Sequence, residues 1–348
     1  MLSIPFFRKN LGIDLGTTNS LIYLDKRGIV VNEPSIVAVN TNTNVILATG
    51  NEAKKMLGRT PNHVKVVRPL VNGVISDFEM SQEVLKQLLK KIQDKGVLTN
   101  YRRAVIGIPS DLTEVERKSV EDAVRGAGVF QTYLIEEPLA AALGARLPVN
   151  EPSANMIMDI GGGTTEIAVI SMAGMVIARS LKVAGDKLDQ DIINFVREEF
   201  KLAIGEPTAE EIKIAIGSAG PLTQKLEMTI RGRDLTTGLP KEMTIKDTQV
   251  RAAISKSLEA IVEATKEVIE SAPPELAGDI LRKGITLCGG GSLLRKLDQL
   301  LSRELAVAVH MVEDPLTCVA RGTGIVVENL EKYEPLLNNP MKPKEINL

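Results

Sequence analysis

Two stretches decide the fold of this sequence: D-L-G-T-T-N-S at residues 14–20 and D-I-G-G-G-T-T-E at residues 159–166. Each follows an apolar segment and carries an Asp directly before a turn of glycine and small hydroxyl residues. Such a turn lets backbone N–H groups approach an anion closely, because no bulky side chain blocks the way. A single hairpin of this kind is commonly only a turn, but two in register predict a pair of facing phosphate-binding hairpins.

An internal repeat surrounds the two hairpins. The sequence predicts the same three-stranded meander around each, over residues 10–33 and 155–180. A strand that leads into a helix and then an acidic-proline helix follow in both halves, at 103–109 and 136–145 in the first and at 284–289 and 313–324 in the second. Chance similarity of short glycine-containing strands would not preserve this order, so we infer a duplication.

The alternation of strands and helices predicts an α/β fold of two duplicated halves, each an open sheet flanked by helices, with a ligand cleft between them. Segments without a counterpart in the other half are expected to form a smaller inserted subdomain in each half. The expected divisions are 1–33, 75–145 and 315–348 for the first core subdomain, 34–74 for the first inserted subdomain, 146–182 and 247–314 for the second core subdomain, and 183–246 for the second inserted subdomain.

Local patterns predict individual helix and turn positions. Packing helices are expected at 81–95 and 252–271, where apolar residues recur at helical spacing. Thr113 and Glu116 have the spacing of a capping box. The second turn of the second meander is placed at 173–174, and the helix after the third glycine cluster is expected near 293–305.

Composition excludes several classes of function. The chain has 348 residues and a net charge of −2, so it lacks the overall positive field that favours nucleic acid, and no nucleic acid partner is expected. Two Cys and two His are too few for a disulfide framework or a His-based metal cage, and a reducing, intracellular setting fits. Cys318 and both His are interpreted as structural. No run of eighteen apolar residues is present, so no segment is expected to span a bilayer.

The carboxylates and glycines near the hairpins suit a nucleotide. Mg²⁺ accompanies polyphosphates and keeps water ligands, so Asp14 and Asp159 are candidates to hold Mg²⁺ through water; alternatively, each only caps its turn. The cluster C-G-G-G-S-L-L at 288–294 is expected to end a strand and open a helix, where a nucleoside or a phosphate fits. Neither the P-loop motif nor the Rossmann motif G-x-G-x-x-G occurs, so the two commonest nucleotide folds lack their signatures.

These motifs resemble those of the superfamily that contains actin, Hsp70-type chaperones and sugar kinases. D-L-G-T-T-N-S looks like its first phosphate motif, D-I-G-G-G-T-T-E like its second, and C-G-G-G-S-L-L like its adenosine motif. Within the superfamily, the chain is most similar to the bacterial actin-like MreB family over essentially its whole length. Further stretches that carry this likeness are N-E-P-S-I-V-A (32–38), I-E-E-P-L-A-A-A-L-G-A (135–145), V-A-G-D-K-L-D (183–189), I-G-S-A (216–219), R-G-R-D-L-T-T-G-L-P (231–240) and P-P-E-L-A-G-D-I (273–280).

The resemblance implies an actin-like ATPase fold that binds ATP with Mg²⁺ between its halves. It implies that Glu137 and Thr164 order the attacking water, which suits a hydrolysis that needs an in-line water and charge neutralisation. Glu136, one position earlier, is interpreted as a charged helix start. The residues implied to bind the nucleotide are Asp14, Gly16, Thr17, Thr18, Asn19, Gly161, Gly162, Gly163, Glu210, Lys213, Gly289, Gly290, Gly291 and Ser292.

Three functional classes share this fold, so the fold alone leaves them open. An Hsp70-like protein would need a peptide-binding domain, which is not expected after the second acidic-proline helix. A sugar-type kinase would need a catalytic Asp base and a polar sugar pocket, and the sequence points to neither. By the resemblance, we expect a protein that polymerises with further copies of itself and helps to set rod cell shape by organising cell-wall synthesis.

Two apolar groups are candidates for membrane contact. Val97 and Leu98 lie in a loop flanked by Lys and Arg, which suits an anionic membrane surface, although the loop could equally be an ordinary connector. Phe6 and Phe7 near the N-terminus are a second candidate, with packing on the chain's own domain as the alternative. The expected location is the cytoplasm, at the inner face of the cell membrane. The expected partners there are membrane proteins of the cell-wall elongation machinery.

Overall fold

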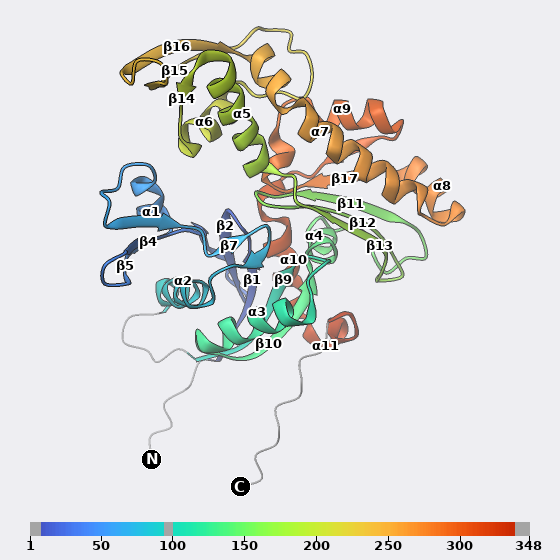
Figure 1. Ribbon diagram of the computed structural model, residues 1–348. Coiled ribbons are helices and arrows are strands. Elements are labelled where there is room, and N and C mark those ends of the chain that lie inside the picture. Colours follow the sequence, from blue (N-terminus) through green and yellow to red (C-terminus); the bar gives the residue numbers. More distant parts are fainter. Residues whose placement is uncertain (1–7, 94–99, 338–348) are drawn as a thin grey trace.

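Two five-stranded sheets with the same strand order form the framework of the protein. A computed structural model describes residues 8–93 and 100–337 (Figure 1). The first sheet has the order β10-β9-β1-β2-β3 and the second β18-β17-β11-β12-β13. The strands of the first sheet are β1 (Arg8–Leu15), β2 (Asn19–Leu24), β3 (Gly28–Pro34), β9 (Asn100–Ile108) and β10 (Val129–Glu136). Those of the second are β11 (Asn155–Ile160), β12 (Thr165–Ser171), β13 (Gly174–Leu181), β17 (Ile285–Cys288) and β18 (Val309–Met311).

Strand directions match between the two sheets as well. In each, three consecutive strands form an antiparallel meander, one later strand pairs in parallel with its first strand, and a second later strand pairs in parallel with that added strand. The predicted duplication and both predicted meanders are therefore confirmed. The second turn of the second meander is shifted by one position from its prediction: it consists of Met172 and Ala173, both with positive φ, as a two-residue hairpin requires.

Helices flank both sheets. They are α2 (Phe78–Lys91), α3 (Glu114–Gly126), α4 (Glu137–Gly144), α7 (Asp247–Glu270), α8 (Pro274–Lys283), α9 (Leu297–Leu305), α10 (Cys318–Glu328) and α11 (Leu330–Tyr333), followed by a short 3-10 turn, Glu334–Leu336. The predicted packing helix at 81–95 is α2, which begins earlier because the Asp77 side chain accepts a hydrogen bond from the Met80 N–H (3.0 Å). The helix predicted at 252–271 is α7. The predicted capping box of Thr113 and Glu116 is present at the start of α3.

The third glycine cluster departs from the prediction. Gly290–Leu293 form a 3-10 turn, and helix α9 begins only at Leu297. Lys296 has a left-handed backbone (φ 65°), which interrupts any continuous helix from the glycines. The second acidic-proline segment likewise starts as a 3-10 turn, Pro315–Thr317, before α10 begins.

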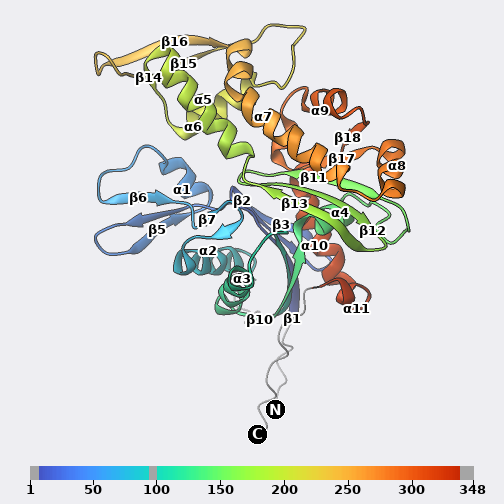
Figure 2. The ribbon, with the colours of Figure 1, turned by 45° about the vertical axis from the view of Figure 1, so that its right-hand side comes forward.

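Helices α4 and α10 lie side by side at the junction of the two halves (Figures 1 and 2). A Cβ built on Gly144 would clash with the Cys318 carbonyl, and one on Gly322 would clash with the Ala140 carbonyl. The two helices therefore approach through glycine. Around them, one apolar cluster contains residues of both sheets, such as Val105 of β9 and Ile157 of β11. This shared core places the carboxyl ends of the central strands of both sheets around one cleft.

Each half also carries a small three-stranded sheet, β5-β4-β6 in the first and β14-β15-β16 in the second. The elements of the first segment are β4 (Val37–Asn40), β5 (Val45–Thr49), α1 (Asn51–Met56), β6 (Val64–Val67), β7 (Leu70–Val71) and β8 (Val74–Ile75). Those of the second are α5 (Gly185–Phe200), β14 (Leu202–Ala203), α6 (Glu206–Ile216), β15 (Glu227–Asp234) and β16 (Pro240–Lys246). The two small sheets lie one above the other, each in its own half of the molecule (Figure 2). The expected subdomain boundaries stay a prediction.

Within residues 8–93 and 100–337, none of the helices combines the length and the apolar character that crossing a membrane needs.

Candidate functional site

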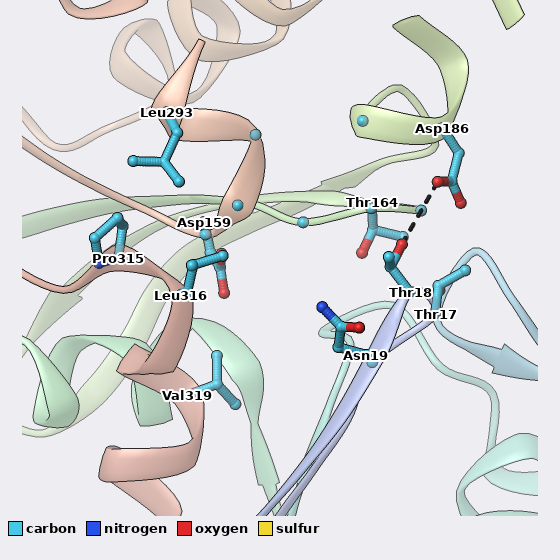
Figure 3. A pocket seen from close by; sticks show the side chains of 18 of the residues that line it. Thr17, Thr18, Asn19, Asp159, Thr164, Asp186, Leu293, Pro315, Leu316 and Val319 are labelled. Carbon is cyan, nitrogen blue, oxygen red and sulfur yellow. Dashed lines mark hydrogen bonds between the residues drawn. The ribbon is translucent and has the colours of Figure 1, made fainter. Parts of the chain in front are cut away.

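A cavity of about 570 Å³ lies between the two halves (Figure 3). Its walls come from the β1–β2 and β11–β12 hairpins, the starts of α4, α5 and α10, helix α6, and the glycine turn after β17. The predicted site residues that line it are Asp14, Gly16, Thr17, Thr18, Asn19, Glu137, Asp159, Gly161, Gly162, Gly163, Thr164, Glu210, Lys213, Gly289, Gly290 and Gly291. The structure thus brings together residues that are up to 277 positions apart, from Asp14 to Gly291.

The two glycine hairpins touch at their tips. A Cβ built on Gly163 would lie 2.6 Å from Thr17 Oγ1, and one on Gly162 would clash with Thr18. Only glycine fits at these two positions, because the opposite hairpin occupies the space. Thr17 Oγ1 accepts a hydrogen bond from the Gly73 N–H (2.8 Å), and the Thr18 hydroxyl donates to Asp186 Oδ1 (3.5 Å; Figure 3). The close approach at the glycines shows that the hairpins face each other, as the sequence predicts.

Carboxyl groups concentrate at the inner end of the cavity. Burial raises the pKa of Asp14 to about 8, and the neighbouring Asp159 carboxylate adds to the shift. Burial and then the Glu166 carboxylate raise the pKa of Asp159 to about 7. The pKa of Glu137 is raised well above its usual value, first by burial and then by repulsion from the same carboxylates. Such a cluster favours a bound cation, since a cation would relieve the repulsion.

The oxygen-only donor set at Asp14 and Asp159 fits Mg²⁺, a hard cation that prefers carboxylates and water. In the described part of the chain, no group of three or more Asp, Glu, His or Cys side chains is arranged to hold a metal by itself. The residues present therefore fit a cation that keeps most of its water ligands, and the placement of Mg²⁺ at Asp14 and Asp159 stays a prediction.

Glu166 is a buried residue of the site that the sequence prediction did not single out. It is 1% exposed and lies opposite Asp159 in the β11–β12 ladder. Its carboxylate accepts hydrogen bonds from the Ser110 hydroxyl (2.7 Å) and N–H (3.3 Å), and from the Ser180 hydroxyl. It thereby joins the second sheet to the loop after β9. The only signal in the sequence was its place as the last residue of the second hairpin motif.

At the other end of the cavity, the predicted pair of Glu210 and Lys213 is engaged by neighbouring residues. Lys213 Nζ donates to Asp189 Oδ2 (2.8 Å) and to the Gly185 carbonyl (2.8 Å). Glu210 pairs with Lys54 of helix α1, across the cleft (3.0 Å). Burial raises the pKa of Asp189 to about 6, although the Lys213 ammonium opposes the shift. Asp189 was not predicted, and its only signal was the acidic residue at the end of V-A-G-D-K-L-D.

Ser292 does not line the cavity, in contrast to the prediction. Its side chain is 3% exposed, and its hydroxyl donates to the Gly289 carbonyl (2.6 Å), so it stabilises the glycine turn. The sequence does not predict an apolar wall beside this turn, which consists of Ile214, Leu293, Leu294, Pro315, Leu316 and Val319. Figure 3 shows Leu293, Pro315, Leu316 and Val319 of this wall. Apolar side chains around a few polar groups are typical of a site for a planar ring.

The four residues predicted to contact a membrane, Phe6, Phe7, Val97 and Leu98, lie outside the described residues.

Two duplicated sheets, two facing phosphate hairpins and a cleft lined by carboxylates define the class of this protein: it has the actin-like nucleotide-binding fold. A family model described as "MreB/Mbl protein" matches residues 8–335. The chain belongs to the MreB/Mbl family. The predicted resemblance is thereby confirmed, and the Hsp70-like and kinase alternatives are not favoured.

Individual relatives agree with this assignment. The chain is 47% identical over 326 residues to cell shape-determining protein Mbl of Bacillus subtilis (strain 168). The aligned residues cover 94% of this chain and 98% of the relative. It is 44% identical over 331 residues to cell shape-determining protein MreB of Escherichia coli (strain K12), covering 94% and 95%.

Solved structures share the same fold. The crystal structure of MreB 5 of Spiroplasma citri bound to AMPPNP has a TM-score of 0.90 and 39% identity, and it covers 95% of this chain and 99% of that one. The structure of the same Spiroplasma protein bound to ADP also has a TM-score of 0.90, with 38% identity and coverage of 96% and 100%. A MamK double helical filament shares the fold alone, at 23% identity, a TM-score of 0.78 and coverage of 93% and 99%.

Proposed function

We propose that this chain binds ATP with Mg²⁺ in the central cavity, hydrolyses it, and polymerises into filaments at the inner face of the cell membrane. The observation that carries the proposal is that both phosphate hairpins and the carboxylate cluster line one cavity between the halves. The names of the cell shape-determining relatives and the AMPPNP in a structural neighbour support it. In the cell, the filament would organise cell-wall synthesis with membrane proteins of the elongation machinery, and so help to set rod shape.

Different residues of the cavity bind the phosphates, the cation, the attacking water and the nucleoside. Backbone N–H groups of the two hairpins bind the phosphates, while Asp14 and Asp159 hold the cation through water. Bound Mg²⁺ would neutralise charge that develops on the phosphate oxygens. Glu137, fixed at the start of α4, and Thr164, at the end of the second hairpin, orient the attacking water. Glu210, Lys213 and the glycine turn after β17 form the nucleoside end.

The first test removes the carboxylate that orients the water. Glu137→Gln is expected to bind ATP normally but to lower the rate of phosphate release by about 100-fold or more, as loss of a positioned acid-base group commonly does. Glu136→Gln is the matched control, because Glu136 lies next in sequence and pairs instead with Arg117 of α3 (3.6 Å). Equal phosphate release from Glu137→Gln and the unchanged chain would remove Glu137 from this role.

The second test addresses assembly and membrane contact. With Mg-ATP, the protein is expected to sediment as filaments and to decorate anionic liposomes, because weak anchors gain avidity along a polymer. Val97→Ser with Leu98→Ser, combined with removal of residues 1–7, should abolish liposome binding and spare sedimentation. Val45→Ser with Leu47→Ser, which changes an exposed apolar pair of β5, is the control. Failure to polymerise under any condition would contradict the filament proposal, and retained lipid binding would place the anchor elsewhere.

A further inference from the structure

The two cysteines of the chain meet in the folded protein. Cys288 ends β17, and Cys318 begins α10, 30 positions later. The segments next to them are joined by a hydrogen bond from the Gly289 N–H to the Pro315 carbonyl (2.9 Å). Both side chains are at most 1% exposed and belong to the same apolar cluster, and each thiol shifts the pKa of the other. The chain has only two cysteines, and they lie in neighbouring segments of one apolar cluster.

Cys318 has the surroundings of a reactive thiol. Cys318 is 1% exposed, but it is one of the residues that line the nucleotide cavity, so a small solute in the cavity lies next to this residue. Arg321 Nη2 lies 3.2 Å from its Sγ. The neighbouring Cys288 thiol and the Arg321 guanidinium lower the pKa of Cys318, although burial opposes the shift. The Cys318 thiol and burial raise the pKa of Cys288, so Cys318 is the thiol that ionises first. A thiol with a guanidinium beside it, a position at a cavity wall and a second thiol in the same apolar cluster is the arrangement of a redox-sensitive pair.

We propose that Cys288 and Cys318 are a redox modification site, which peroxide converts to a disulfide across the floor of the nucleotide cleft. The Cys318 thiolate attacks one peroxide oxygen, the O–O bond breaks, and a sulfenic acid and hydroxide form; the hydroxide takes up a proton to give water. The Cys288 thiol then attacks the sulfenic sulfur, the S–S bond forms, and a second water leaves. The two thiols lose two electrons and the peroxide gains them, and a dithiol reductant reverses the change.

Such a bond would connect the two halves of the protein. Cys288 belongs to the second sheet through β17, whereas α10 packs against β1, β9 and α4 of the first half. Gly289, Gly290 and Gly291 follow Cys288 directly and line the cavity. The disulfide therefore restrains the opening of the cleft, which slows exchange of bound nucleotide. This consequence, unlike the disulfide itself, rests on the proposed function.

The chemical part is tested on the full unmodified chain without any functional assay. The reduced protein is treated with hydrogen peroxide, digested without reductant and analysed by mass spectrometry. We expect a Cys288–Cys318 linked peptide that dithiothreitol removes, and we expect excess Mg-ATP to slow its formation by occupying the cavity. Absence of the linked peptide, or oxidation of Cys318 to sulfinic acid without linkage, would overturn the proposal. Equal rates with and without Mg-ATP would overturn access through the cavity.

The functional part is tested by release of a fluorescent ADP analogue. Oxidised protein should release the analogue about 5-fold more slowly than reduced protein, which is the low end of ordinary coupling between sites. Reductant should restore the rate. Cys288→Ser, which lies outside the cavity lining, should bind the analogue as the reduced chain does and show no response to peroxide; Cys288→Ala repeats the test if serine disturbs the core. A linked chain with unchanged release would refute the restraint of the cleft. A reduced chain that binds no nucleotide would refute the proposed function and leave the disulfide result intact.

Discussion

At the scale of single residues, ionisation of the buried carboxyl groups of Asp14 and Asp159 destabilises the fold. Their pKa values of about 8 and about 7 compare with 3.8 for the unperturbed group, because burial and mutual repulsion disfavour the charged form. Between pH 4 and pH 8 the folded chain consequently binds more protons than the unfolded chain. By linkage, this contribution to stability is present at low pH and is lost as the pH rises through the folded values.

We therefore predict that the nucleotide-free protein becomes less stable between pH 5 and pH 7.5. The free energy of unfolding should fall by up to about 1 kcal/mol per pH unit for each of the two carboxyls, which denaturant titrations at several pH values can measure. Asp14→Asn should flatten this slope. Asp234→Asn is the control, since hydrogen bonds from Lys241, Thr237 and Thr236 lower the pKa of Asp234 to about 2, outside the range. A stability that rises with pH over this interval would refute the prediction.

At the scale of elements, the sequence predicts what depends on local pattern and misses what depends on distant contacts. Both meanders and α2 follow from strand and helix periodicity, and the hairpin glycines follow from their spacing. The start of α9 was misplaced because the left-handed backbone of Lys296 has no signature in a Lys side chain. The resemblance places Ser292 at the ligand, whereas its hydroxyl donates a hydrogen bond to the Gly289 carbonyl of its own turn. Glu166 and Asp189 were missed because their partners, Ser110 and Lys213, are 56 and 24 positions away.

The contact between α4 and α10 gives a prediction about elements. Gly322→Ala should destabilise the protein by about 1–3 kcal/mol, because the added methyl group meets the Ala140 carbonyl, which is helix backbone and cannot move aside alone. Gly278→Ala in α8 is the matched control: nothing lies near its Cβ position, so better helix propensity should stabilise the protein by roughly 0.5–1 kcal/mol. Denaturant unfolding of both variants measures the difference, and equal effects would contradict close packing through Gly322.

At the scale of the whole molecule, two ion pairs join the small sheets' segments across the mouth of the cleft. Lys54 of α1 pairs with Glu210 of α6 (3.0 Å), and Arg68 pairs with Glu206 at the start of α6 (3.4 Å). These side chains are partly exposed to solvent, so each pair contributes at most about 1 kcal/mol. Both pairs exist only when the two sides of the cleft are close together. Their free energy therefore acts on the balance between the closed and the open cleft rather than on the fold of either half.

We predict that Arg68→Glu and Glu206→Arg each speed the release of bound nucleotide by up to about 5-fold, the equivalent of roughly 1 kcal/mol of lost attraction plus new repulsion. The double variant, which restores opposite charges, should return the rate toward that of the unchanged chain. Neither residue lines the cavity, so the effect does not pass through lost ligand contacts. Lys55→Glu with Glu52→Lys reverses a pair inside helix α1 (2.6 Å) and should leave the rate unchanged. High salt should reduce the differences in release rate among these variants, since exposed charges are screened. If the single variants release nucleotide at the rate of the unchanged chain at low salt, the cleft does not open between these residues.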